Sequence, residues 1–177
     1  MLEIILGTVV GIAIILIFLV FMHNKFQFAI IKIEEAENNI DILLHKKLDL
    51  LNRAASVVKK ELKLEDFLNE LEDEKNCNCS LFELNSVLKK NYDLFFKMLD
   101  DNEKLFKSEI LTTIINDINS NEIDLVAAIK FYNDGVVCFN KLISSFPSNV
   151  YAFIKRYKKK DFYNNEKKEI FDILNDK

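Results

Sequence analysis

The chain opens with an uninterrupted apolar run. Residues 4–22 carry no charged side chain, and fourteen of the nineteen are Leu, Ile, Val or Phe. Each of these favours membrane insertion by roughly 0.3–0.6 kcal/mol, and nineteen helical residues nearly span a hydrocarbon core about 30 Å thick. A cleaved signal peptide is disfavoured, because no basic region precedes the run and no small-residue cleavage site follows it. The pattern predicts an N-terminal transmembrane anchor over residues 1–24.

From about residue 25 the apolar positions recur every three or four residues, the period of one helix face. They predict three long helices, over residues 25–72, 80–99 and 103–146. Ser80 and Glu83 form a capping box that starts the second helix, and Pro147 ends the third. The inward positions at the end of the third helix are predicted to be Leu125, Ile129, Tyr132, Val136, Phe139, Ile143 and Phe146.

Such regular spacing over about forty residues is typical of coiled-coil-like packing. Only three glycines and one proline occur in 177 residues, which also favours long elements. The sequence therefore predicts an all-α protein, in which the transmembrane helix is followed by an antiparallel, coiled-coil-like bundle of three long helices. The bundle is expected to span residues 25–146, and a basic-aromatic tail with a shorter C-terminal helix covers residues 147–177.

The charges flanking the apolar run predict its orientation. His23, Lys25 and Lys32 follow it, whereas no basic residue precedes it, so the positive-inside rule places the bundle in the cytoplasm. The cysteine count is odd, and Cys77 and Cys79 are too close for an ordinary structural disulfide, which suits a reducing compartment.

The stretch "FYNDGVVCFNKLISSFPSN", residues 131–149, concentrates polar residues at the end of the third helix. If Tyr132 and Phe139 face the core, Asn133 and Asn140 border the same edge of the seam, where their amides would bond to a neighbouring helix. Asp134 would face solvent. A helix end with register-setting amides is the favoured interpretation, and a binding site is the alternative.

The same stretch resembles the closing helix of the LemA family, in which a similar FYN-D-A-V, Y-N and F-P-S-N run recurs. Other parts match in the same order: "EEA" at 34–36, "ID" at 40–41, "KLDLL" at 47–51, Glu122 and "RYKKKDFY" at 156–163. Gly135 replaces the usual alanine. The resemblance implies a bacterial membrane protein crossing the membrane once, with its N-terminus outside and a helical bundle in the cytoplasm. No enzymatic activity is established for the family as a class.

Several kinds of chemistry are disfavoured. A net charge of −4 gives no general attraction to nucleic acid. A di-metal bundle needs Glu-x-x-His pairs, which His23 and His45 do not form, and Cys77 and Cys79 supply only two of four zinc ligands. Phosphate-binding loops need glycines, and Gly135 alone follows the anchor. No catalytic residue, metal ligand or cofactor is predicted.

The expected function is therefore a non-enzymatic scaffold or adaptor, which binds the lipid bilayer through residues 4–22 and an unidentified protein through its bundle. A ligand-binding or enzymatic bundle with a pocket near residues 131–149 is the alternative. The candidate interaction surface comprises Tyr132, Asn133, Asp134, Asn140, Lys155, Arg156, Tyr157, Lys158, Lys159 and Lys160.

Two further features concern the membrane and the helix within it. Gly7 and Gly11 form a G-x-x-x-G motif that would allow a homo-oligomer, although chance spacing is favoured. The basic cluster at 155–163 would suit anionic lipid. However, three alternating helices would place it at the end of the bundle distal to the membrane, so a solvated face or an acidic partner is preferred.

Overall fold

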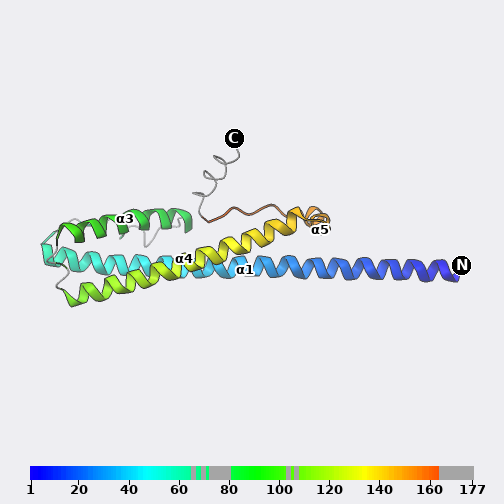
Figure 1. Cartoon of the computed structure of the whole chain (residues 1–177), viewed down its shortest axis with the longest axis horizontal. Coiled ribbons are helices and arrows are strands. Elements are labelled where there is room, and N and C mark those ends of the chain that lie inside the picture. The colour runs from blue at the N-terminus through cyan, green and yellow to red at the C-terminus, as the bar shows by residue number, and fades with distance from the viewer. Residues whose placement is uncertain (65–66, 69–70, 72–80, 103–104, 106–107, 164–177) are drawn as a thin grey trace, which may run out of the picture. The chain divides into compact units, whose positions relative to one another are not determined.

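The structure is a computed structural model that describes residues 1–64, 67–68, 71, 81–102, 105 and 108–163. It contains the helices α1 (Leu2–Leu62), α3 (Leu81–Asp101), α4 (Glu109–Ser144) and α5 (Ser148–Lys155), which Figure 1 shows along the chain. No strand occurs in these described ranges. The prediction of an all-α protein is confirmed.

α1 runs without a break from the apolar run into the periodic region, where the sequence predicted an anchor and a separate first bundle helix. No glycine or proline lies between Gly11 and Leu62, so nothing interrupts the backbone hydrogen bonds. The helix ends before the predicted residue 72 because Lys63 adopts a left-handed conformation, with φ of 54°. The Leu64 N–H then donates to the Lys59 carbonyl at 3.1 Å, which is a common way to close a helix.

The first part of α1 keeps its apolar side chains exposed. Among the described residues, α1 is the one helix long and apolar enough to cross a membrane by length and composition, and its most apolar window is 0% buried. In a soluble protein such side chains would normally be buried. A contiguous exposed apolar patch of this size therefore marks an interaction site. The segment is therefore a possible membrane helix.

The chain divides into two compact units, and α1 and α4 each contribute to both. Unit 1 comprises Met1–Ala36 and Lys130–Lys177, and unit 2 comprises Glu37–Ile129. Ser80 of the predicted capping box, together with Cys77 and Cys79, lies outside the described residues.

Unit 2 is a helical core built from α1, α3 and the first part of α4. The apolar positions of α1 that recur every three or four residues are buried from Leu44 to Val58, and each fully buried leucine contributes about 1.5–3 kcal/mol relative to exposure. The buried side chains that α3 and α4 add are Leu84, Leu88, Phe95, Leu99, Leu111, Ile114, Ile118 and Leu125.

Unit 1 is centred on Phe26, whose side chain is 0% exposed. Its ring lies 5.9 Å from that of Phe139 in α4, 5.5 Å from that of Tyr151 in α5 and 5.0 Å from that of Tyr157. A cluster of four aromatic rings thus joins α1, α4, α5 and the chain after α5. Such pairs contribute about 0.5–1.5 kcal/mol each beyond the burial of their area.

Gly135 permits a close approach of α4 to α1 within the same unit. A Cβ at this position would lie 3.0 Å from the Cγ1 atom of Ile33, which is tighter than ordinary packing. This close contact gives a packing reason for glycine at position 135, where the family that the sequence resembles usually has alanine.

The predicted inward stripe of α4 fails at its end. Phe146 is 83% exposed, and Ile143 is only partly buried. The physical reason is Pro147: proline disfavours a helical residue before it, so α4 ends at Ser144 and Phe146 leaves the helical stripe. The buried face passes instead to α5, through Ser148, Tyr151 and Ala152.

Candidate functional site

The polar residues of the 131–149 stretch hold the tail segment, which we define as residues 157–163, against α4. The side chain of Asn140 makes two hydrogen bonds to the backbone of Lys160. Its Nδ2 donates to the carbonyl at 2.8 Å, and its Oδ1 accepts from the N–H at 2.9 Å. An amide that bonds both backbone groups of one residue fixes the position of an extended segment much as a neighbouring strand would.

Two residues about two turns earlier in α4 hold the end of the tail segment. Asn133 Oδ1 accepts a hydrogen bond from the Tyr163 N–H at 2.8 Å, and the Tyr132 hydroxyl donates to the Asp161 carbonyl at 3.3 Å. The rings of Tyr132 and Tyr163 meet edge to face at 6.0 Å. Burial, and to a lesser extent Tyr132, raises the pKa of Tyr163 to about 12, so its hydroxyl stays neutral at physiological pH.

These contacts correct part of the predicted interaction surface. Asn133 and Asn140 bond to the tail segment and not to a neighbouring helix, because Arg156 ends α5 in a left-handed conformation and the chain continues beside α4. Tyr157 is partly buried against Phe26 and Phe139. The predicted surface residues that remain exposed are Asp134, Lys155, Arg156, Lys158 and Lys159.

The prediction that the basic cluster lies far from the anchor is wrong. Tyr151 packs on Phe26, and its hydroxyl lies 3.1 Å from His23 Nδ1. His23 is the first residue after the apolar run. The expectation assumed that the third predicted helix leads away from the anchor. Instead, the later part of α4 contacts the earlier part of α1, as the Phe26–Phe139 and Lys32–Phe131 contacts show.

Two open hollows border the stretch in unit 1. One, of about 490 Å³, is lined by Ile143, Asn149, Val150, Ala152, Phe153 and Tyr157. The other, of about 430 Å³, is lined by Phe21, Asn24, Lys25, Phe28, Cys138 and Leu142. Asn149 is the polar residue of the stretch that borders the first hollow, whereas Tyr132, Asn133 and Asn140 line neither of the two.

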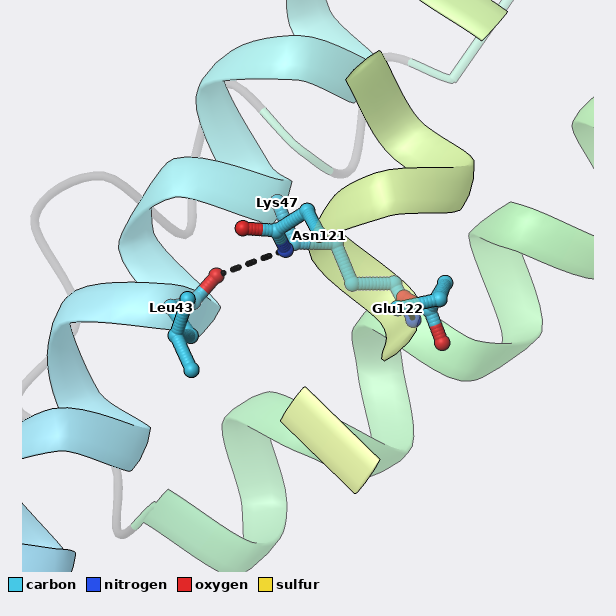
Figure 2. Close-up of polar contacts among 4 residues, drawn as sticks. All are labelled: Leu43, Lys47, Asn121 and Glu122. Carbon is cyan, nitrogen blue, oxygen red and sulfur yellow. Dashed lines mark hydrogen bonds and ion pairs between the residues drawn. The ribbon is translucent and has the colours of Figure 1, made fainter. Parts of the chain in front are cut away.

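A second polar cluster is buried in unit 2, and Figure 2 shows its four residues. Lys47 is 3% exposed, and its Nζ lies 2.6 Å from Glu122 Oε1 and 4.8 Å from the centre of the Tyr92 ring. Asn121, which is 0% exposed, donates from Nδ2 to the Leu43 carbonyl at 3.1 Å, while its Oδ1 is buried without a hydrogen-bond partner.

This cluster was missed at the sequence level. Lys47 lies three residues after Leu44 and four before Leu51, at the edge of the seam, but its charge does not indicate a buried position. Burial, followed by the negative charges of Glu122 and Asp93, raises the pKa of Tyr92. Polar residues at such positions commonly set helix register.

In the ranges that the structure describes, no group of three or more His, Cys, Asp or Glu side chains is arranged to hold a metal ion. His45 lies 3.5 Å from Asp41 on an exposed face of α1. Cys138 is a free, exposed thiol.

The first prediction concerns the amide that holds the tail segment. Replacing Asn140 by alanine removes two hydrogen bonds and should cost about 1–3 kcal/mol. We expect faster hydrogen exchange in residues 157–163 of the full chain, measured by mass spectrometry. Asp134→Ala, an exposed change on the same helix, is the control and should leave this exchange unaltered. Equal exchange in both variants would contradict the assignment.

The second prediction concerns the buried ion pair, whose two partners differ in exposure. The Lys47 side chain is 4% exposed and that of Glu122 is 29% exposed. Glu122→Ala leaves a buried cation unpaired, so it should approach the cost of about 3–5 kcal/mol that is typical of breaking a buried pair. Lys47→Met leaves a carboxylate that water can reach, and should cost less.

Denaturant unfolding of the full chain in detergent would measure both changes, with Lys46→Met as the exposed control on the same turn of α1. A larger loss for Lys47→Met than for Glu122→Ala would show that packing of the lysine stem, and not its charge, dominates.

Comparisons with known proteins complete the description of the site. A search of curated proteins finds no match to the chain. The model of the LemA family matches residues 36–172, which include all the residues that bind the tail segment and the whole buried polar cluster. The apolar run of α1 lies outside the matched range. On this match over most of its length, the chain belongs to the LemA family.

Proposed function

We propose that this protein is a non-enzymatic scaffold or adaptor, anchored by a single transmembrane helix at the cytoplasmic face of a bacterial membrane. The observation that carries the proposal is α1, because one continuous helix leads from an exposed apolar segment directly into the packed bundle. A rigid connection of this kind suits a protein that holds a surface at a fixed place beside the bilayer.

The arrangement of basic residues supports the cytoplasmic orientation. His23, Lys25 and Lys32 follow the apolar run in the sequence. Tyr151 and Tyr157 pack on Phe26, which brings exposed basic residues to the same end of the run. These are Lys155, Arg156, Lys158 and Lys159. A larger excess of positive charge on one side of a membrane helix strengthens the expectation that this side is cytoplasmic.

We also propose that α1 and α4 pair as an antiparallel, coiled-coil-like pair. Within unit 1, Phe26 and Lys32 contact Phe139 and Phe131, so the residue numbers fall along α4 as they rise along α1. Within unit 2, Leu43 and Lys47 contact Asn121 and Glu122. The buried positions of α4 between Ile118 and Phe139 are spaced by three or four residues, which also supports seam packing.

The non-enzymatic part of the proposal rests on how the polar side chains are used. Those of the family-like stretch bind the chain's own tail segment, and those around Lys47 bind one another. The homo-oligomer through Gly7 and Gly11 stays a prediction: a Cβ at either position would meet nothing within 4 Å, so a second helix has room to approach.

The anchoring is tested with the exposed thiol of Cys138. In a Cys77→Ser/Cys79→Ser chain expressed in cells, a membrane-impermeant maleimide should label Cys138 only after lysis, and the protein should stay with the membranes in alkaline carbonate. Labelling of intact cells would reverse the orientation, and release by carbonate would remove the anchor.

The adaptor role is tested in the same cells by a photo-crosslinking residue at Asp134, which is exposed on α4. We expect a discrete crosslinked band of higher mass that is absent when the residue replaces Leu125, which is buried. Absence of any crosslink from Asp134 or from Lys158 would count against a docking surface on unit 1.

A further inference from the structure

The outer face of α5, with Phe146 just before it, carries an apolar stripe that the described residues leave uncovered. Phe146, Val150, Phe153 and Ile154 are 83%, 48%, 85% and 63% exposed. Val150, Phe153 and Ile154 are spaced i, i+3, i+4 and therefore share one face of the helix. Ser148, Tyr151 and Ala152 occupy the opposite face and are buried. This short helix thus has two faces with apolar side chains, one packed on the core and one that no other described part of the chain covers.

We propose that this outer face of α5, together with the basic residues that follow it, docks on the lipid surface of the membrane that anchors α1. The apolar stripe would enter the boundary between headgroups and acyl chains, and the basic side chains would contact anionic headgroups. The inference rests on the proposed anchoring and adds a second, separate membrane contact of the same chain.

The position of α5 along α1 is the first argument. His23 Nδ1 lies 3.1 Å from the Tyr151 hydroxyl, and Phe26 stacks on the Tyr151 ring at 5.5 Å. The apolar run ends at Met22, so these contacts lie within about 6 Å of its end along the helix axis. Figure 1 shows α5 at the end of α4, beside α1. If residues 4–22 fill the hydrocarbon core, α5 lies at the level of the headgroups.

The charge of the same surface is the second argument. Lys155, Arg156, Lys158 and Lys159 are exposed directly after the apolar stripe, and Asp161 is the exposed acidic residue among them. Basic residues near an anionic leaflet contribute about 1 kcal/mol each. Exposed aromatic and aliphatic residues beside a row of basic residues are the composition of segments that lie in a membrane interface. An acidic protein partner would complement the basic residues, but it would not account for the exposed apolar stripe beside the end of the apolar run.

The chain contains no tryptophan, so a single introduced one reports its own surroundings. We would reconstitute the full-length Phe153→Trp variant in vesicles of phosphatidylcholine and phosphatidylglycerol, with acyl-brominated lipid as a quencher. Phe131→Trp is the matched control, since Phe131 contacts Lys32 about 15 Å beyond Met22 along α1. Ile14→Trp, in the middle of the apolar run, reports whether the anchor itself is in the bilayer.

We expect bromolipid to quench Phe153→Trp and Ile14→Trp but not Phe131→Trp. Quenching of Phe153→Trp should fall several-fold in vesicles of phosphatidylcholine alone. The same fall is expected in mixed vesicles when Lys155, Lys158 and Lys159 are all replaced by Gln, which leaves the backbone hydrogen bonds of Lys160 intact.

Each other outcome overturns a distinct statement. Quenching of Ile14→Trp without quenching of Phe153→Trp would overturn the docking and leave the anchor in place. Equal quenching of Phe153→Trp with and without phosphatidylglycerol, and in the lysine variant, would overturn the role of anionic lipid. No quenching of Ile14→Trp would overturn the proposed anchoring itself.

Discussion

The burial of Phe26 is the interaction on which the organisation of unit 1 depends. Its ring touches Phe139, Tyr151 and Tyr157, which belong to α4, α5 and the tail segment. These parts are distant from Phe26 in sequence, so their association with α1 must be held by side-chain packing. Truncating a fully buried phenylalanine typically costs about 3–5 kcal/mol, which is a large part of the stability of a small domain.

This constraint connects the anchor with the basic tail. Phe26 lies four residues after Met22, the last residue of the apolar run, so whatever packs on it lies close to the end of that run. Asn140, Asn133 and Tyr132 then hold the tail segment along α4, from Lys160 to Tyr163. The aromatic cluster fixes the position of α5 and the start of the tail segment, and the hydrogen bonds fix the course of the tail segment along α4. In unit 2 the pair Lys47–Glu122 and the amide of Asn121 have a comparable role in register.

Periodicity was enough to predict the helices and most of their buried faces, because apolar residues at three- and four-residue spacing have few other ways to leave water. It failed where a local rule competes with the pattern. Phe146 continues the spacing but lies beside Pro147, which ends the helix, and Lys47 lies between core leucines although it is charged. The partner predicted for Asn133 and Asn140 was also wrong, since periodicity identifies which face of a helix is buried and not which segment covers it. The contact of α5 with Phe26 has no sequence signal of its own, because it depends on how two distant helices pair.

The most direct test of this account compares two conservative changes in α1 of the full chain in lipid nanodiscs. Phe26→Leu removes a buried ring, whereas Phe28→Leu removes one that is 72% exposed. We expect hydrogen exchange to accelerate over residues 148–163 in the Phe26 variant alone, with protection of α3 unchanged. Unaltered exchange of residues 148–163 in the Phe26→Leu variant would contradict the claim that this ring holds α5 and the tail segment beside the end of the apolar run.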